Sequence, residues 1–120
     1  MKVYFVIAAL TAFLCASAAE IHGKVIKVYD GDTITVVDHL DKGKFRIRLA
    51  GIDAPEKGCP GDAEATEYLS KQILNKDVII RYKSIDRYAR PLGIVFATDG
   101  ININDEMLRK GLVKKYKSKK

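Results

Sequence analysis

The sequence predicts an α+β protein, a small closed or partly closed β-barrel with helices packed on it. Five short segments have the β-branched or alternating pattern of strands and are separated by turn residues. Two segments with helical spacing follow the third and the fifth of these strands. A chain of 120 residues favours one domain, and 48% hydrophobic with 30% charged residues excludes a disordered chain.

The first two predicted strands form a hairpin. Residues 21–28 are rich in β-branched side chains, and residues 33–37 read Thr-Ile-Thr-Val-Val. The Asp-Gly pair between them, within residues 29–32, supplies turn chemistry.

The third predicted strand, residues 44–52, has one apolar and one basic face. Its alternating side chains place Phe45, Ile47 and Leu49 on one face and Arg46, Arg48 and Ala50 on the other. One face therefore belongs to the core, and the opposite face carries two guanidinium groups. Gly51 predicts a bend, and Pro55 ends the strand.

The remaining elements alternate between helix and strand. Asp62 is the predicted N-cap of a helix that ends near Asn75, and its apolar stripe consists of Ala65, Leu69 and Ile73. The fourth and fifth strands are residues 78–82 and 92–97. Asn104 is the predicted N-cap of a second helix, with an Ile103–Leu108 hydrophobic staple and Gly111 at C′. A five-stranded barrel of the OB type fits this count, although the alternation also fits an open α+β sheet.

The N-terminus has the organisation of a signal peptide, predicted as residues 1–19. Lys2 gives a positive start, residues 3–14 are almost continuously apolar, and small residues follow. Cleavage after Ala18 or after Ala19 fits equally well. A buried N-terminal helix and lipidation of Cys15 are the alternatives. The protein is thus expected to be secreted or periplasmic, without membrane insertion, with residues 20–120 as its mature domain.

Cleavage would change the charge and the cysteine content. The formal net charge falls from +6 to +5 with the loss of Lys2, and Cys59 remains alone. A lone cysteine forms no internal disulfide, so Cys59 is either a surface thiol or a reactive one. The basic segment 114–120 is either a solvated end or an attractor of phosphates.

Three clusters of charged residues carry the candidate chemistry. They are Asp30-Gly31-Asp32-Thr33, Asp53-Ala54-Pro55-Glu56 and Asp86-Arg87-Tyr88-Ala89-Arg90. Converging carboxylates favour Ca²⁺ or Mg²⁺. The histidines and Cys59 lack the spacing of zinc ligands, and the spacing of an EF-hand loop is missing too. A divalent cation, paired arginines and a free carboxylate are the groups that phosphodiester cleavage requires.

The sequence resembles the staphylococcal nuclease (thermonuclease) family across nearly all of the predicted mature chain. The resemblance rests on four stretches in the same order and spacing: Val28–Thr33, Arg46–Glu56, Asp86–Arg90 and Asn104–Leu112. It implies an OB-type barrel and a calcium-dependent endonuclease that acts on DNA and RNA and leaves 3′-phosphate and 5′-hydroxyl ends. We also expect a monomer with no obligate protein partner.

The resemblance assigns roles to individual residues. Asp32 and Asp53 match carboxylate calcium ligands, and Ala54 stands where the family offers a main-chain carbonyl. Arg48 matches the arginine that holds the scissile phosphate, Arg90 the second arginine, and Glu56 the residue assigned as general base. The remaining expected roles are auxiliary: Asp30 assists the metal, Arg87 and Tyr88 bind substrate, and Arg46 attracts substrate or forms an ion pair.

One departure from the family pattern affects the second arginine. Ala89 stands where glycine often occurs, so a positive φ there would strain the loop that carries Arg90. Pro91 favours an extended Arg90. The alternative function is a non-catalytic OB-type module that only binds nucleic acid, for which the full acidic and arginine set would be unnecessary.

Overall fold

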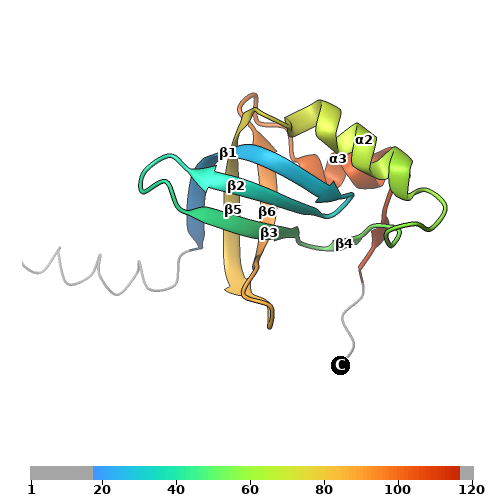
Figure 1. Cartoon of the computed structure of the whole chain (residues 1–120), viewed down its shortest axis with the longest axis horizontal. Coiled ribbons are helices and arrows are strands. Elements are labelled where there is room, and N and C mark those ends of the chain that lie inside the picture. The colour runs from blue at the N-terminus through green and yellow to red at the C-terminus, as the bar shows by residue number, and fades with distance from the viewer. Residues whose placement is uncertain (1–17, 117–120) are drawn as a thin grey trace, which may run out of the picture.

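The computed structural model describes residues 18–116, and the barrel with its two helices is shown in Figure 1. Nearly all of the predicted signal segment and the last four residues of the basic segment lie outside the described residues. The elements are β1 (Ala19–Asp30), β2 (Thr33–Asp38), β3 (Lys44–Leu49), β4 (Ile52–Asp53), α2 (Asp62–Ile73), β5 (Asp77–Ile85), β6 (Pro91–Ala97), α3 (Ile103–Arg109) and β7 (Lys114–Lys115).

Five strands close into a barrel in the order β1–β2–β3–β6–β5, which confirms the predicted OB-type fold over the open sheet. The pairs are antiparallel except β3–β6, which is parallel at Arg48–Leu92 and Leu49–Gly93. The parallel pair brings the arginine face of β3 beside the start of β6, directly after Arg90. Closure therefore joins two predicted site segments that are far apart in the sequence.

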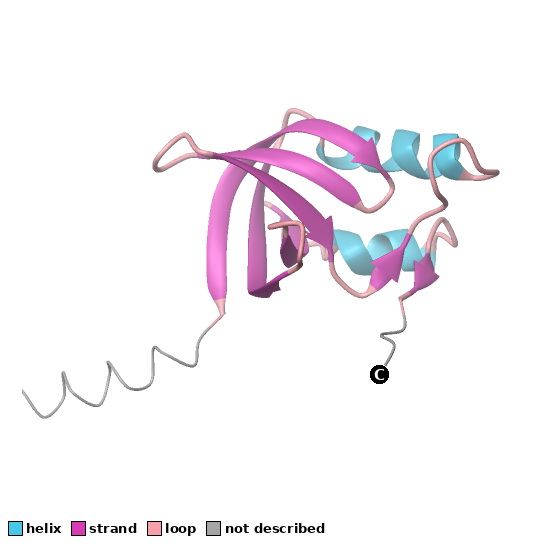
Figure 2. Cartoon of the chain, turned by 60° about the horizontal axis from the view of Figure 1, so that its bottom comes forward, coloured by secondary structure: helices cyan, strands magenta, loops and turns pink. Residues whose placement is uncertain are grey.

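The core consists of the inward-facing strand residues and one stripe from each helix. Its fully buried large side chains are Ile34, Ile47, Leu49, Ile52, Leu69, Ile73, Ile80, Ile103 and Met107. The predicted stripe of α2 is confirmed, because Ala65, Leu69 and Ile73 are its buried residues. Burial of such aliphatic side chains contributes about 1.5–3 kcal/mol each. Both helices lie at the same end of the barrel as β4 and β7 (Figure 2).

The predicted N-cap of α2 is wrong by one residue. Gly61, with φ +92°, occupies the N-cap position and makes no side-chain capping bond. Asp62 lies inside the first turn, where its carboxylate accepts from the Gly58 amide at 3.0 Å and the Thr66 hydroxyl at 3.3 Å. Its side chain thus secures the preceding loop and the first turn of the helix.

The predicted N-cap of α3 is also wrong. Asn102 caps the helix by accepting from the Asp105 amide at 3.0 Å. Because α3 begins at Ile103, the predicted Ile103–Leu108 staple does not form. At the other end Gly111, with φ +75°, is at C′ as predicted, and the Leu112 amide donates to the Met107 carbonyl.

Asn104 is instead a buried residue whose side chain links α3 to the barrel through hydrogen bonds. Its side-chain oxygen accepts from the Val95 amide at 3.0 Å, and its amide nitrogen donates to the carbonyls of Ala50 at 2.8 Å and Gly93 at 3.1 Å. These bonds fix the turn between β3 and β4. Asn104 therefore positions the segment that leads to Asp53.

The strand boundaries differ most from the prediction in β1, β5 and β3. β1 and β5 are longer than predicted, since Ala19 already pairs with Tyr82 and Ile85 still pairs with Pro91. The predicted third strand is broken after Leu49, where Gly51, with φ +77°, provides the predicted bend. Among the described residues, none of the helices is long and apolar enough to cross a membrane.

The start of the basic segment is a short strand whose side chains are exposed. In β7, Lys115 pairs with Ile52 and Lys114 with Asp53 of β4. The Tyr116 amide then donates to the Gly51 carbonyl at 2.9 Å. The C-terminal strand therefore lies against the acidic loop and belongs to the surroundings of the site.

Candidate phosphate and cation site

The first acidic turn is packed against the second acidic loop. A Cβ on Gly31 would lie 2.8 Å from Ala65 Cβ and 2.9 Å from Ala54 Cβ, so only glycine fits between α2 and this loop. The close approach brings the Asp32 carboxylate within 2.8 Å of the Ala54 amide, which donates to its Oδ2. The Thr33 hydroxyl donates to its Oδ1 at 2.9 Å. Asp32 is thus buried and held rigidly.

Arg48 joins the two acidic segments from the outer face of β3. Its Nη1 donates to the carbonyls of Leu49 and Ile52, both at 2.8 Å, and lies 3.5 Å from Asp32 Oδ2. Its Nη2 lies 3.3 Å from Asp53 Oδ1. The guanidinium therefore has a fixed position between two carboxylates.

Asp30 stands beside this group and differs from Asp32 in its environment. Its Oδ1 accepts from the Asp32 amide at 3.1 Å. Burial is the main cause that raises the pKa of Asp30, and the adjacent Asp32 carboxylate adds to it, while the Asp32 amide and Lys57 oppose the shift. Two carboxylates so close together create the negative potential that attracts a cation.

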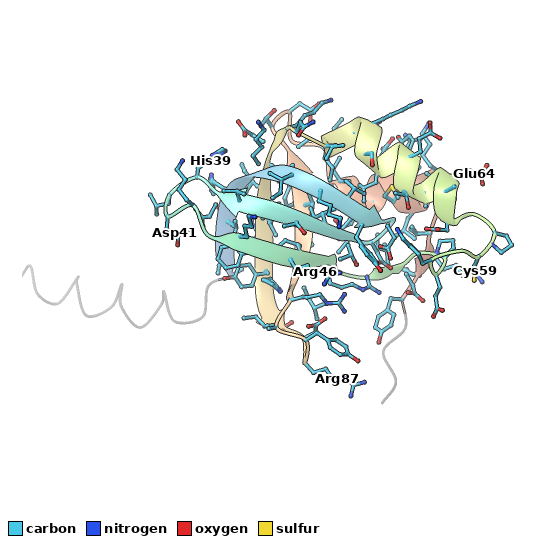
Figure 3. All side chains as sticks on the ribbon, in the orientation of Figure 1. His39, Asp41, Arg46, Cys59, Glu64 and Arg87 are labelled. Atoms are coloured by element: carbon cyan, nitrogen blue, oxygen red, sulfur yellow. The ribbon has the colours of Figure 1, made fainter. Side chains whose placement is uncertain are left out.

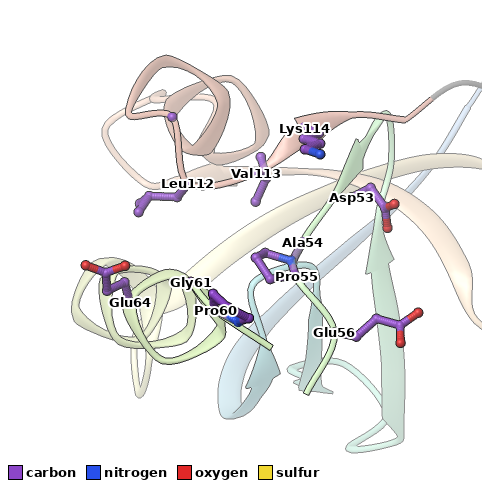
Figure 4. Close-up of a pocket in the computed structure, with 11 residues that line it drawn as sticks. Asp53, Ala54, Pro55, Glu56, Pro60, Gly61, Glu64, Leu112, Val113 and Lys114 are labelled. Atoms are coloured by element: carbon purple, nitrogen blue, oxygen red, sulfur yellow. The ribbon is translucent and has the colours of Figure 1, made fainter. Parts of the chain in front are cut away.

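Glu56 reaches the same region from the loop after β4. It lines a cavity of about 480 Å³ together with Asp53, Ala54, Glu64 and Lys114. In Figure 4 the carboxylates of Asp53 and Glu56 lie on the same side of this cavity, whereas Glu64 extends from α2 on the opposite side. Glu56 and Asp53 are both exposed, so solvent reaches their oxygens.

Arg90 is presented by the hairpin between β5 and β6. Asp86 Oδ2 accepts from Arg90 Nε at 2.9 Å and forms an ion pair with Nη2 at 2.8 Å. Its Oδ1 accepts from the backbone amides of Arg90 at 3.0 Å and Tyr88 at 2.9 Å. Burial would raise the pKa of Asp86, but the hydrogen bonds from Arg90 and Tyr88 outweigh it and lower the pKa.

The same hairpin contains the predicted backbone strain. Ala89 has φ +64°, the left-handed conformation that favours glycine. The Ala89 amide donates to the Asp86 carbonyl, and the Asp86 amide to the Arg90 carbonyl. This is a three-residue hairpin loop that ends in a left-handed residue. The strain is retained because the Asp86 carboxylate holds the loop from inside.

One cavity joins the two arginines. A volume of about 320 Å³ is lined by Arg48, Arg90, Tyr88 and Tyr116, among others. The guanidinium of Arg90 lies over the Tyr88 ring at 5.4 Å and that of Arg48 over the Tyr116 ring at 5.8 Å. Arg87 lies at the tip of the hairpin (Figure 3), exposed and 5.5 Å from the Tyr88 ring centre. The cavity has the charge and size to accept a phosphate with an attached nucleoside.

The oxygen donors fit a hard divalent cation in type. Asp32 is held rigidly, and Asp53 is exposed. The Ala54 carbonyl belongs to the loop that follows Asp53, and the amide of the same residue contacts Asp32. Ca²⁺ takes about 6–8 oxygen ligands, so water and substrate oxygens must supply the rest. Within residues 18–116 no group of three or more His, Cys, Asp or Glu side chains is close enough to form a cation site by itself.

The structure brings together most of the predicted site residues. Arg48 contacts Asp32 and Asp53 and shares a cavity with Arg90, while Glu56 shares another with Asp53. Sequence reasoning gave no role to Asp86 or Tyr116. The opposite charges of Asp86 and Arg90, four residues apart, are the sequence signal that could have predicted this ion pair. Tyr116 depends on the β4–β7 pairing, for which the sequence carries no local signal.

Fold and site together define a class of protein. It is a five-stranded OB-type barrel whose rim carries acidic oxygens beside an arginine pair suited to phosphate. The family described as "Staphylococcal nuclease homologue" matches residues 46–120. The chain belongs to the staphylococcal nuclease family.

Relatives in several bacteria agree with this membership. An "Uncharacterized endonuclease" of Escherichia coli O157:H7 is 45% identical over 93 residues, which is 78% of this chain and 60% of that protein. A "Micrococcal nuclease" of Shigella flexneri is 36% identical over 107 residues, 82% of this chain and 60% of that protein. "Protein ParB" of Escherichia coli is 35% identical, with 92% of this chain and 67% of that protein covered. The chain thus spans about 60% of the length of the first two.

Proposed function

We propose that this protein is a calcium-dependent endonuclease that hydrolyses DNA and RNA to 3′-phosphate and 5′-hydroxyl ends. The observation that carries the proposal is the position of Arg48. It contacts two carboxylates suited to a cation and opens into the cavity that also contains Arg90. A phosphodiester bound there would contact both guanidinium groups, with the oxygens of Asp32 and Asp53 beside Arg48.

Each residue has a distinct role in this proposal. Asp32, Asp53 and the Ala54 carbonyl hold Ca²⁺, which supplies charge neutralisation and polarises the phosphoryl oxygen. Arg48 binds a non-bridging oxygen of the scissile phosphate, and Arg90 stabilises charge on the phosphate and on the departing 5′ oxygen. Glu56 orients the attacking water and accepts its proton. The water oxygen bonds to phosphorus as the P–O5′ bond breaks, the departing 5′ oxygen takes a proton from solvent, and the phosphate remains on the 3′ end.

The test is cleavage of a single-stranded DNA oligonucleotide with calcium and with a chelator. We expect cleavage with calcium only. Equal rates in both conditions would refute the metal dependence, and no cleavage in either would refute the enzyme. Ends that polynucleotide kinase labels without prior dephosphorylation would show the 5′-hydroxyl product; 5′-phosphate ends would contradict the proposed bond.

Arginine variants test the site itself. Arg48→Gln and Arg90→Gln should each reduce kcat by about 10²–10³-fold, the usual cost of removing an electrostatic stabiliser. Arg81→Gln is the matched control, because Arg81 is an exposed arginine on β5 that pairs with Glu20. Activity retained in the Arg48→Gln, Arg90→Gln double variant would show that the site assignment is wrong.

A non-catalytic nucleic-acid-binding module is the alternative within the same fold. It would bind the oligonucleotide without cleaving it, and Asp32→Ala would leave the affinity unchanged.

We also propose that the chain is exported to the periplasm or the medium and acts as a monomer. The apolar segment after Lys2, followed by small residues, supports export. Mass spectrometry of the protein produced from the whole chain should find Ala19 or Glu20 as the first residue. An intact Met1 would contradict cleavage, and sedimentation equilibrium tests the monomer.

A further inference from the structure

Three cations surround the ring of Tyr29 at the end of β1. The Lys57 ammonium lies 4.4 Å from the ring centre, the Arg46 guanidinium 5.1 Å and the Lys27 ammonium 5.8 Å. Lys57 also donates to the Tyr29 carbonyl at 2.6 Å, which ties the loop after β4 to β1. We call Lys27, Tyr29, Arg46 and Lys57 the tyrosine cluster.

The barrel register explains why these residues meet. Lys27 pairs with Thr35 of β2, and Thr35 pairs with Arg46 of β3, so the two cations flank one position on the outer face. The register of β1 shifts between Val28 and Asp30, which makes Tyr29 the extra residue of a bulge. Tyr29 is exposed and lies two residues after Lys27, whose ammonium group reaches its ring.

The positive charge of the cluster has no acidic partner in contact. In the part of the chain that the structure describes, neither lysine nor Arg46 forms an ion pair with a carboxylate within 4.0 Å. The ring face attracts each cation and partly offsets their mutual repulsion. Three cations held together beside one nearby carboxylate, that of Asp30, retain a net positive charge, which favours a polyanion as partner.

The cluster is continuous with the arginine cavity. Arg46 lines a hollow of about 300 Å³ together with Tyr88 and Arg90. Arg46 also lies two residues before Arg48 on the same face of β3. In Figure 3 it lies on the barrel face that looks toward the hairpin carrying Arg87. A strand with a phosphate at Arg48 and Arg90 can therefore continue over Arg46 toward Tyr29.

We propose that the tyrosine cluster is a second phosphate-binding surface, which holds a single-stranded nucleic acid beyond the phosphate in the arginine cavity. Its cations contact the phosphates that follow along the strand, and Tyr29 keeps the cations together. The surface makes the protein prefer strands over dinucleotides. This inference rests on the proposed function for the position of the first phosphate, whereas the binding itself requires no cleavage.

The test compares two double variants with the same charge change. Lys27→Gln with Arg46→Gln removes the two cations that flank Thr35. Lys24→Gln with Lys44→Gln is the matched control, because Lys24 and Lys44 flank Val37 on the same three strands, nearer the His39 turn. Binding of a single-stranded DNA of about 12 nucleotides, within the site size of an OB-type domain, is measured with chelator present and at several salt concentrations.

We expect the cluster variant to lose affinity about tenfold more than the control. Its salt dependence should be less steep by about 1.4 in slope, which is about 0.7 for each lost phosphate contact. Tyr29→Leu retains every charge and should lower the affinity about threefold. The ratio of kcat/KM for the strand to that for a dinucleotide should fall in the cluster variant and not in the control.

Equal losses of affinity in the two double variants would mean that only net charge matters, which overturns the proposal. A fall in kcat/KM of equal size for strand and dinucleotide would also overturn it, by placing the residues in the arginine cavity. Binding that depends on the cluster in a protein that cleaves nothing would support the surface and refute the nuclease. A wild-type protein that neither binds nor cleaves would refute both.

Discussion

A substitution at Asp86 can disturb the orientation of the Arg90 guanidinium without removing Arg90 itself. In Asp86→Asn the side-chain oxygen can still accept from the amides of Tyr88 and Arg90, so the hairpin retains its shape. The other carboxylate oxygen becomes an NH₂ group, which cannot accept from Arg90 Nε and Nη2. The guanidinium is therefore released while the loop remains in place.

The distances set the expected size of the effect. Two charge-assisted contacts, at 2.9 and 2.8 Å, hold the guanidinium, and the Asp86 side chain is only 17% exposed. Hydrogen bonds to charged groups contribute about 1.5–3 kcal/mol each. Removal of a whole electrostatic stabiliser costs about 2.7–4 kcal/mol, which is the upper limit here. We expect kcat to fall about 10–100-fold, with a smaller change in KM.

The assay is oligonucleotide cleavage at saturating substrate, combined with a double-mutant cycle. Once Arg90→Gln is present, Asp86→Asn should cost almost nothing more, because no guanidinium is left to orient. A thermal melt of each variant shows whether the fold is retained. Independent losses in the two single variants, or kcat within twofold of wild type for Asp86→Asn, would refute the positioning role.

Three further predictions concern stability. Ala89→Gly should raise the free energy of unfolding in urea by about 0.5–1 kcal/mol, because relief of the positive φ exceeds the added entropy of the unfolded chain; a decrease would contradict the strain. Asn104→Ala should lower it by about 2–4 kcal/mol, since the Val95 amide and the Ala50 carbonyl lose buried partners, whereas a loss below about 1 kcal/mol would show that water replaces them. The pKa of Asp86 is lower in the folded protein than its ordinary value of 3.8, so the ionised carboxylate stabilises the fold at pH values above 3.8. This stabilisation is lost as the pH falls through the lower pKa of the folded state. The difference in Tm between wild type and Asp86→Asn should therefore shrink from pH 5 to pH 3, and a constant difference would contradict this assignment.

The strands could be predicted from their β-branched or alternating residues and from the Asp-Gly turns, whereas closure into a barrel followed only from the family resemblance. Phe45, Ile47 and Leu49 define the core face of β3, so the opposite face with Arg48 follows from the pleat alone. The strand ends were predicted less well. Polar residues such as Glu20 and Ser84 extend β1 and β5 through backbone pairing, which side-chain patterns do not record.

The cap of α3 shows where local patterns reach their limit. Asn102 and Asn104 are both good capping residues, two positions apart, and the sequence does not distinguish them. The partners that bury Asn104 come from β6 and from the turn after β3. These contacts depend on how the chain closes in space. The short strands β4 and β7 were missed for the same reason, since two residues have no periodicity.

The candidate site was accessible because its residues cluster in three short motifs, and the motif order carried the family resemblance. The motifs did not indicate which residues hold the site side chains in position. Asp86 holds Arg90, and Gly31 allows Asp32 to reach the Ala54 amide. A local motif names the groups that perform chemistry, whereas the groups that hold them come from packing.

The pairing of β4 with β7 has a consequence for synthesis of the protein. The strand that contains Asp53 has its partner at Lys114 and Lys115, so the acidic loop is complete only when this late segment has left the ribosome. Until then the emerging polypeptide lacks the backbone that pairs with the Asp53 segment. A chain arrested before residue 114 would therefore contain Asp32, Arg48 and Asp53 without the strand that pairs with the Asp53 segment.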